Sequence, residues 1–491
     1  MSENYLYKPN IIRLNDIKNK VYSLHPSEHR RIILNNTNQI FIKNLINEDG
    51  VGEQIEVSEY LKFDSDFTLV TISNMERCII DKSAGERISP FIYENSSKKL
   101  HKGDVLISRN ASLGKITLVH EDFKSILNGG ISYLRFKEEY KYYCFAFFLM
   151  NYGKDYLSML TSGGGTQKNA KRKNLLDVKI PFPTSKNSSN PDLLQLFVSI
   201  LTQNIINKEI AIDSKQKRIN TIVDNELNEN IQDSNFKYSY PSKYSLLNVR
   251  RLDTSLYTKR YLEENYKIEH YRKGFYQIPI NLFKSGSTPK TRIINGMKSI
   301  LKWVTPTNIS DGGFFNPIDT ISMPTSNNID KDCILFINRT SKGKRGEFVG
   351  ITCYYDITYY GKGHHNQGIY RIEGLDKEEM LFLTAFMNSS IMRKICGCLS
   401  NGSKMKEMKV SDFANLKFPN FDISLKKQIG ELYYKKVEKE KYTIESYLEK
   451  ESLRSQELGI FQLYQEIIEE KKRLNDIIDK IIKEERIEIE L

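Results

Sequence analysis

The chain has 491 residues, of which 39% are hydrophobic and 27% charged, as is typical of a globular protein with more than one domain. No stretch approaches the ~18 apolar residues of a membrane span, and residues 1–10 contain no apolar signal region, so a cytoplasmic protein is expected. The formal net charge of +12 favours a polyanionic partner. The cysteines lack the spacing of a zinc site or disulfide framework, and we interpret them as core thiols: Cys78, Cys144, Cys333, Cys353, Cys396 and Cys398.

Residues 1–186 are expected to form a first globule built mainly of short strands. The runs DVLIS (104–108), KITLV (115–119) and YLRF (133–136) have the length and composition of strands. YYCFAFFLMNYG (142–153) is a longer apolar stretch that predicts a helix. Together they predict a mixed α and β fold in which sheet predominates.

Two loops of this globule combine basic and amide side chains, as a DNA-binding surface requires. Lys, Arg and small hydroxyls contact phosphates, and Asn or Gln can read adenine. The loop SRNASLGK (108–115) offers Arg109, Asn110 and Lys115. The loop that begins SGGGTQKN (162–169) offers Thr166, Gln167, Lys168, Asn169, Lys171, Arg172 and Lys173. We interpret both loops as DNA-contacting; the alternative is an exposed turn, or a structural junction with the helix that follows.

A long helix is predicted at 187–232, with Asn190 as its cap and Pro191 in its first turn. Its apolar residues form a heptad pattern, Val198, Ile205, Ile212 and Ile219 with Leu201 and Ile222, which Lys208 and Lys215 interrupt. About 40 residues span about 60 Å at 1.5 Å per residue, which favours a coiled coil over an ordinary core helix.

The second half of the chain repeats the first. VTISNM (70–75) matches VTPTNI (304–309), GDVLIS (103–108) matches KDCILF (331–336), and NGGI (128–131) matches NQGI (366–369). The segment from Ser162 to Pro183 likewise matches the segment that begins at Ser400. Because the matches keep their order, we predict a duplicated unit. A polar linker (233–249) then leads to a second globule (250–421) and a second long helical region (422–491), in which Gly430 and Gly459 are weak points.

The second globule carries basic loops of its own, in SGSTPKT (285–291), INRTSKGKRGE (337–347) and the turn after Ser400. The candidate DNA contacts there are Lys290, Arg292, Arg339, Lys342, Lys344, Arg345, Lys404, Lys406 and Lys409. Arg339 is interpreted as the counterpart of Arg109.

These motifs resemble those of the specificity subunit of Type I restriction-modification systems. SGSTPKT with WVTPTNISDG (303–312) is similar to the opening of that family's target-recognition domain, and KGDVLISRNASLGKITLV (102–119) to its middle. SGGGTQKNAKRKNLLDVKIPFP (162–183) is similar to its end, and RRLDTSLYTKRYL (250–262) to a segment before second domains. The first half shows no counterpart of Gly286-Ser287-Thr288-Pro289 or of Trp303.

The resemblance implies an α+β fold with two similar β-rich target-recognition domains, long antiparallel coiled-coil spacer helices and a pseudo-twofold internal repeat. It implies a non-catalytic subunit that reads a bipartite site in double-stranded DNA and positions two adenine methyltransferase subunits, and also restriction subunits. S-adenosylmethionine would belong to the methyltransferase, with no cofactor or metal in this chain. The predicted partner-binding residues lie on the long helices: Val198, Leu201, Ile205, Ile212, Ile219, Ile222, Ile467, Leu474, Ile478 and Ile481.

Two other classes of function stay open at this point. A methyltransferase or nuclease would need a recognisable site, but SPF (89–91) lacks a second Pro, DVK (177–179) is better explained as a strand entry, and no phosphate-binding glycine motif fits. His364-His365 is interpreted as a loop pair near DNA or solvent rather than a metal site, and Trp303 as a core residue. A coiled-coil scaffold or antirestriction protein that does not read DNA is the third possibility.

Overall fold

The computed structural model describes residues 6–7, 11–15, 31–32, 34–109, 114–159, 161–162, 169–170, 172–233, 235–242, 251–288, 301–309, 313, 320–321, 328–341 and 348–489. The chain divides into two compact units. Unit 1 comprises residues 1–210, 438–456 and 465–491, and unit 2 comprises residues 211–437 and 457–464. The predicted domain boundaries treat the helical regions as separate segments, and they stay a prediction.

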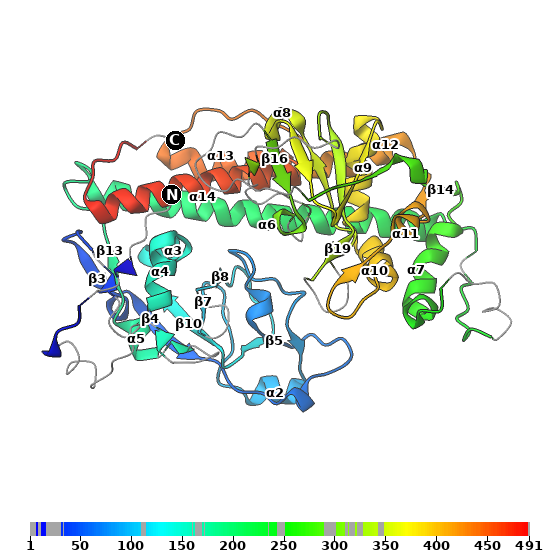
Figure 1. Cartoon of the computed structure of the whole chain (residues 1–491). Helices are drawn as coiled ribbons and strands as arrows, with labels where there is room; N and C mark the ends of the chain where they lie inside the picture. Colours follow the sequence, from blue (N-terminus) through cyan, green and yellow to red (C-terminus); the bar gives the residue numbers. More distant parts are fainter. Residues whose placement is uncertain are drawn as a thin grey trace. The chain divides into compact units, whose positions relative to one another are not determined.

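The described part of unit 1 contains a four-stranded sheet, a three-stranded sheet and three two-stranded sheets, together with helices (Figure 1). One sheet has the strand order β4-β10-β7-β8, a second has the order β6-β5-β9, and β13 pairs with β3. The strands are β1 (Leu6–Tyr7), β2 (Arg31–Ile32), β3 (Gln39–Phe41), β4 (Ile46–Val51), β5 (Thr68–Val70), β6 (Glu86–Arg87), β7 (Val105–Ser108), β8 (Ile116–Leu118), β9 (Ser125–Leu127), β10 (Ile131–Phe136), β11 (Thr161–Ser162), β12 (Asn169–Ala170) and β13 (Lys179–Pro181). The helices are α2 (Pro90–Asn95), α3 (Glu138–Leu149), α4 (Asn151–Met159), α5 (Arg172–Leu176) and the long α6 (Pro191–Glu229), whose second half belongs to unit 2.

Unit 2 repeats the strand orders of the four-stranded and three-stranded sheets and the pairing of β3 with β13. Its sheets have the orders β15-β22-β18-β20 and β17-β16-β21, and β14 pairs with β24. The strands are β14 (Phe275–Tyr276), β15 (Phe283–Ser285), β16 (Leu301–Val304), β17 (Thr320–Ile321), β18 (Cys333–Ile337), β19 (Arg339–Thr340), β20 (Thr352–Tyr355), β21 (Gly363–His365), β22 (Ile369–Glu373), β23 (Lys406–Glu407) and β24 (Phe418–Pro419). The helices are α7 (Lys259–Glu269), α8 (Ile357–Tyr360), α9 (Lys377–Met387), α10 (Ser390–Leu399), α11 (Val410–Ala414), α12 (Ile423–Tyr433), α13 (Ile444–Glu457) and α14 (Ile460–Lys483), of which α13 and most of α14 belong to unit 1.

The predicted duplication is confirmed strand by strand. In both three-stranded sheets the central strand is parallel to one neighbour and antiparallel to the other, β5 with β9 and β6, and β16 with β21 and β17. The matched stretches at 70 and 304 both leave that central strand and enter a short 3-10 helix. There Thr71 N donates to Asn74 Oδ1 over 2.8 Å, and Thr305 N donates to Asn308 Oδ1 over the same distance.

The cores of both units consist of the apolar strands and helices that the sequence predicts. Cys78, Cys144, Cys333, Cys353 and Cys396 are buried, and Cys398 is half-buried, which confirms the interpretation as core thiols. Trp303 is 5% exposed and packs with Leu301, as predicted.

The two histidines contradict their prediction. His364 and His365 are fully buried on β21, not in a loop. The strand register places them where the first unit has Ile126 and Leu127. Burial lowers the pKa of His365 to about 3, with Arg371 and His364 adding to the shift, so this imidazole is neutral.

The predicted seam of α6 is buried within the chain itself. Asn190 caps the helix as expected, since its Oδ1 accepts from Leu193 N over 3.0 Å. The buried predicted residues are Val198, Leu201, Ile205, Ile212, Ile219, Ile467, Leu474, Ile478 and Ile481. Ile222 is only half-buried, and Val223 and Leu227 take the buried positions instead. The partner-binding role of these residues stays a prediction, but their side chains pack inside the protein.

The second helical region is not one long helix, because it divides into α12, α13 and α14. Gly459 lies at the last break, where Gly459 N donates to Lys435 O over 2.8 Å. A Cβ on Gly459 would lie 2.3 Å from Lys435 N, so the close passage of the chain before α14 requires glycine. In unit 1, Asn204 and Lys208 of α6 contact Tyr447 and Glu451 of α13, so α13 runs parallel to α6.

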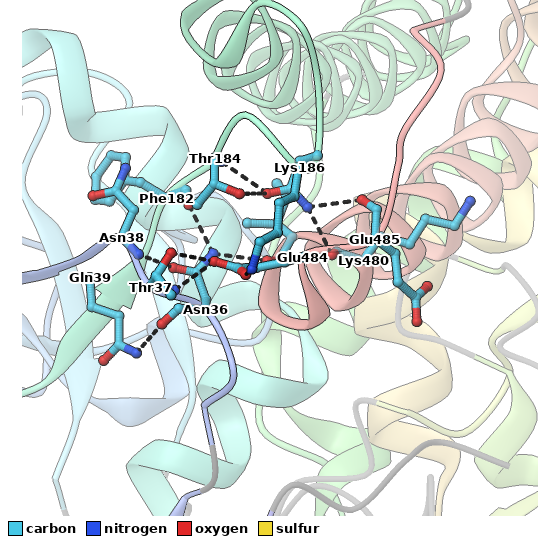
Figure 2. Close-up of polar contacts among 12 residues, drawn as sticks. Asn36, Thr37, Asn38, Gln39, Phe182, Thr184, Lys186, Lys480, Glu484 and Glu485 are labelled. Carbon is cyan, nitrogen blue, oxygen red and sulfur yellow. Dashed lines mark hydrogen bonds and ion pairs between the residues drawn. The ribbon is translucent and has the colours of Figure 1, made fainter.

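The end of α14 is fastened by side chains from both ends of the first globule (Figure 2). Asn36 Nδ2 donates to Ile481 O over 2.9 Å and to Phe182 O over 3.0 Å, and Asn187 Nδ2 donates to Lys480 O over 3.1 Å and to Glu485 O over 2.9 Å. Both amides therefore add a bond to a carbonyl group of the last helical turn, where Ile481 O also accepts from Glu484 N and Lys480 O from Glu485 N. Glu484 has a φ of +55° at this terminus, and its carboxylate accepts from Thr37 N, from Thr37 Oγ1 and from Lys186 Nζ.

Glu484→Gln should weaken unit 1 and flatten the pH dependence of its stability in acid. The hydrogen bonds from Lys186 and Thr37 lower the pKa of Glu484 to about 2, whereas an unfolded Glu has a pKa of about 4.3. A depressed folded pKa stabilises the protein above about pH 4.3, and this stabilisation is lost as the pH falls towards 2. Thermal denaturation from pH 2 to pH 6 measures the difference. Glu485→Gln, at the adjacent exposed side chain, is the control and should keep the unaltered pH dependence; the same pH dependence in Glu484→Gln would contradict the assignment.

Candidate nucleic-acid interface

In each unit, loops that are distant in sequence meet at one end of the four-stranded sheet. In unit 2 this loop cluster comprises residues 286–288, 338–341, 366–368 and 401–409. Ser287 N donates to His365 O over 3.1 Å, Asn338 N to Gly368 O over 2.9 Å, and Met408 N to Asn338 O over 2.9 Å. The described part of the unit 1 loop cluster comprises residues 52–54, 109, 114–115 and 128–130.

An asparagine turn supports both loop clusters with the same hydrogen bonds. Asn366 N donates to Val304 O over 2.8 Å, and Gly368 N donates to Asn366 Oδ1 over 2.8 Å. In unit 1, Asn128 N donates to Val70 O over 3.0 Å, and Gly130 N donates to Asn128 Oδ1 over 3.0 Å. The sequence match at 128 and 366 is therefore a repeated turn. Its structural role was missed because the repeat showed only that these residues correspond.

In both loop clusters, the loop that follows the first strand of the four-stranded sheet begins with a glycine that packs directly against backbone carbonyl groups. A Cβ on Gly286 would lie 2.2 Å from His365 O and 2.3 Å from Asn366 O. A Cβ on Gly52 would lie 2.2 Å from Leu127 O and 2.3 Å from Asn128 O. Gly52 is thus the counterpart of Gly286, and the expectation that the first half lacks one is wrong for this residue. The counterpart of Trp303 is Leu69, by strand register.

In unit 2 the structure joins two basic loops that the sequence presented separately. β19 pairs with β23, so Arg339 lies opposite Glu407 and Thr340 opposite Lys406. Lys404 and Lys409 are exposed on the same turn, whereas Lys406 and Arg339 are half-buried. Four predicted contacts, Arg339, Lys404, Lys406 and Lys409, therefore belong to one small basic surface. Such a two-stranded ribbon has dimensions that the major groove of B-DNA admits.

The first basic loop is shifted by one residue from the predicted match. Arg109 N donates to Gly130 O over 2.9 Å, and the same bond in unit 2 comes from Asn338 N to Gly368 O. Arg109 therefore corresponds to Asn338, not to Arg339. Burial lowers the pKa of Arg109, which is half-buried. Lys115 forms an ion pair with Glu76 at 2.5 Å, so part of its charge is compensated before any ligand binds.

The other predicted DNA contacts have side chains outside the described part of the chain. Asn110, Thr166, Gln167, Lys168, Lys171, Lys290, Arg292, Lys342, Lys344 and Arg345 lie outside the described residues. Asn169 is in β12, and Arg172 and Lys173 are in α5, but their side chains are not described. Their DNA contacts stay predictions.

No enzymatic constellation emerges from the described side chains. The acidic group close enough to share a metal ion is Glu451, Glu466 and Glu470, and Lys208 Nζ lies 3.1, 2.7 and 2.5 Å from its carboxylates. The Lys208 ammonium therefore stands where a cation would. Asp177 precedes β13 and pairs with Lys43 at 3.4 Å, as expected of a strand entry. Within the described ranges, no helix is long and apolar enough to cross a membrane.

Comparison with known proteins agrees with the resemblance found in the sequence. Residues 36–239 match the family model of the Type I restriction modification DNA specificity domain. The matched region covers most of the first globule and all of α6. A search of curated proteins gave no match.

Solved structures of Type I systems align with almost the whole chain. The S subunit of the Type I restriction-modification system from M. genitalium is 15% identical, with a TM-score of 0.39, and the alignment covers 92% of this chain and 97% of that one. The HsdS subunit from Thermoanaerobacter tengcongensis is 13% identical, with a TM-score of 0.27 and coverages of 91% and 96%. A chain from a structure of type I R-M complex assembly and conformational transition has 13% identity, a TM-score of 0.27 and coverages of 92% and 99%. At these TM-scores the assignment depends on the family model.

Gly52→Ala should destabilise unit 1, because the new methyl group would overlap two backbone carbonyls that cannot move independently. The expected decrease in the free energy of unfolding is about 1–3 kcal/mol, the usual cost of overpacking. Denaturant unfolding measures it. Gly129→Ala is the matched control, since its nearest atom would be 3.4 Å away and the expected change is close to zero. Equal decreases in both variants would refute the close contact at Gly52.

Replacing Lys404, Lys406 and Lys409 together by Gln should weaken binding to all DNA sequences alike. If these lysines contact phosphates, the slope of log K against log salt concentration should fall by about 0.9 for each phosphate that is no longer neutralised. Binding titrations at several salt concentrations measure the slope. Lys259, Arg260 and Lys427, which are exposed in the same unit, provide a control triple substitution to Gln. An unchanged slope in the Lys404 triple variant would assign this turn to structure alone.

Proposed function

We propose that the chain is the DNA sequence-recognition subunit of a Type I restriction-modification assembly, and that each unit reads one half of a bipartite site. The observation that carries this proposal is the duplication. The match to a DNA specificity domain covers 36–239, and unit 2 repeats the sheet orders, the asparagine turn and the close glycine contact of that region. A second copy of a specificity domain would read a second stretch of DNA.

The loop clusters have the chemistry that such reading requires. In unit 2, the cationic side chains of the basic turn can contact phosphates and set the position of the domain. Base edges would be read by amide and guanidinium groups, and the candidates in the first domain are Gln167 and Asn169 of the loop that begins at Ser162. Backbone hydrogen bonds such as those from Asn128 N to Val70 O and from Asn366 N to Val304 O hold the described parts of the two loop clusters at the sheets below them.

Catalysis in this proposal belongs to partner subunits. Two adenine methyltransferase subunits would bind S-adenosylmethionine and dock on the long helices, and restriction subunits would complete the assembly. Because the seam residues are buried inside this chain, the docking contacts would come from exposed positions of the same helices. Leu196 on α6 and Leu453 on α13, which are 48% and 58% exposed, are the apolar candidates.

Genome-wide adenine methylation tests the proposal directly. Cells that contain the methyltransferase should methylate a bipartite sequence only when this subunit is present. Exchange of residues 250–421 for the corresponding region of another specificity subunit should change one half of the sequence and keep the other. Single-molecule sequencing of unamplified DNA gives both answers. Methylation that does not depend on this chain, or methyl transfer by the purified chain alone, would exclude the proposed role.

A further inference from the structure

The described part of each loop cluster carries one exposed glutamine, and the two glutamines come from different loops. In unit 2, Gln367 lies at the tip of the asparagine turn, where unit 1 has Gly129. In unit 1, Gln54 lies on the loop that follows β4, and the same position of unit 2 is occupied by Thr288. A glutamine in one unit thus stands opposite a small residue in the other, at both positions.

The two glutamine side chains nevertheless reach the same place in their units. If Gly129 carried a Cβ as Gln367 does, this atom would lie 3.4 Å from Oε1 of Gln54. The amide of Gln54 therefore lies above the turn of unit 1, close to where the side chain of Gln367 begins in unit 2. Thr288 also reaches the turn, since its Oγ1 accepts from Asn366 Nδ2 over 3.3 Å.

Backbone hydrogen bonds hold the chain at both glutamines. The carbonyl group of Gln367 accepts from Asn338 Nδ2 over 3.0 Å, and Asn338 is only 3% exposed. In unit 1, Gly129 N donates to Glu53 O over 2.8 Å, directly before Gln54. Each side chain therefore starts from a fixed point of the loop cluster, which lowers the entropy lost when it binds a ligand.

The terminal amides themselves are available for a ligand. Neither Gln54 nor Gln367 forms a side-chain hydrogen bond with the residues that the structure describes. A glutamine amide offers both a donor and an acceptor, which match N7 and the N6 amino group of adenine in the major groove. Because the amide is uncharged, it adds less to phosphate binding than a lysine at the same position would.

In unit 2 this amide lies beside the basic surface. Asn338, which donates to the carbonyl group of Gln367, directly precedes Arg339 in the chain. The carbonyl group of Asn338 accepts from Met408 N over 2.9 Å, and Lys409 follows Met408. Cationic side chains that contact phosphates set the position of a domain on DNA, whereas neighbouring polar groups that reach base edges determine the sequence.

We propose that Gln54 and Gln367 are specificity-determining residues, and that the amide of each recognises one adenine in the half-site of its own unit. This inference rests on the function proposed above and adds to it one base-reading residue for each unit. The exchange of glutamine between the two loops accounts for the small residues at 129 and 288, since the tip of each turn has room for one long amide side chain.

The test uses the full chain bound to its methyltransferase and a library of DNA duplexes with a long randomised segment. Sequencing of the retained duplexes gives the preferred bases before and after Gln367→Ala. The variant should lose the preference for adenine at one position of one half-site. Binding to the preferred sequence should weaken by about 5- to 150-fold, and binding to other sequences should not change. Gln54→Ala should have the same effect in the other half-site.

Transfer of the glutamine within unit 1 separates base reading from a structural effect. Gln54→Thr should remove the adenine preference of this unit. Addition of Gly129→Gln gives unit 1 the pair of residues found in unit 2 and should restore that preference, because a Cβ at 129 makes only ordinary contacts. Gln428→Ala, at an exposed glutamine of α12, is the control and should leave both half-sites unchanged.

Unchanged preferred sequences in Gln54→Ala and Gln367→Ala would overturn the proposal. An equal loss of binding to all sequences would also overturn it, since that result would assign the two amides to phosphate contacts. Gln367→Met keeps the length of the side chain without its amide, and it should act like Gln367→Ala if base reading is lost. If the unaltered assembly selects no sequence at all, the function proposed above fails, and this inference fails with it.

Discussion

The structure depends on the removal from water of the apolar side chains along α6. This helix has 39 residues and buried positions from Leu194 to Leu227, more than a single small globule can cover. In unit 1, α13 and α14 supply the cover. In unit 2 the second half of α6 is held by hydrogen bonds, in which Gln216 Nε2 donates to Asn388 O and Asn220 Oδ1 accepts from Ser390 N. The returning chain is therefore a requirement of the first long helix, and the end of α14 must then be capped, which Asn36 and Asn187 do. The burial of α6 thus depends on α13 and α14, and the end of α14 depends on Asn36 and Asn187.

Much of this organisation could be predicted because it has a local signal. The repeated stretches, the capped start of α6 and the apolar strands all follow from the order of residues along the chain. The division of the second helical region into α12, α13 and α14 could not be predicted. Gly459 is required because Lys435, which is distant in sequence, passes close to it, and no local pattern shows this contact. The histidines of β21 were misplaced for a related reason. Two adjacent histidines suggest a polar loop when the sequence is considered alone. The strand register instead places them at the buried positions that Ile126 and Leu127 occupy in unit 1.

The sequence predicted which basic residues the candidate interface contains, but not which of its loops lie side by side. Basic turns were recognised from their lysines, yet the pairing of β19 with β23 joins two-residue strands that lie far apart in sequence and have no periodic signal. Gly52 escaped recognition because its neighbours differ from those of Gly286, although the backbone contact is the same. The buried ion pairs of Lys208 were visible only as an interruption of a heptad pattern, since the carboxylates that explain Lys208 come from another part of the chain.

The asparagine turns have a consequence for how such a protein can change over time. Many of the bonds that hold each loop cluster come from backbone groups and from buried or half-buried side chains below the loops, among them Asn128 in unit 1 and Asn366 and Asn338 in unit 2. Exposed loop residues such as Lys404 form none of these bonds, so substitutions at such positions leave the sheet and its turn intact. Mutations that change the contacts of the loops therefore fall at different positions from mutations that impair folding. Diversification can proceed at the surface while the inherited frame is kept, and because each unit has its own frame, the two surfaces can diverge independently.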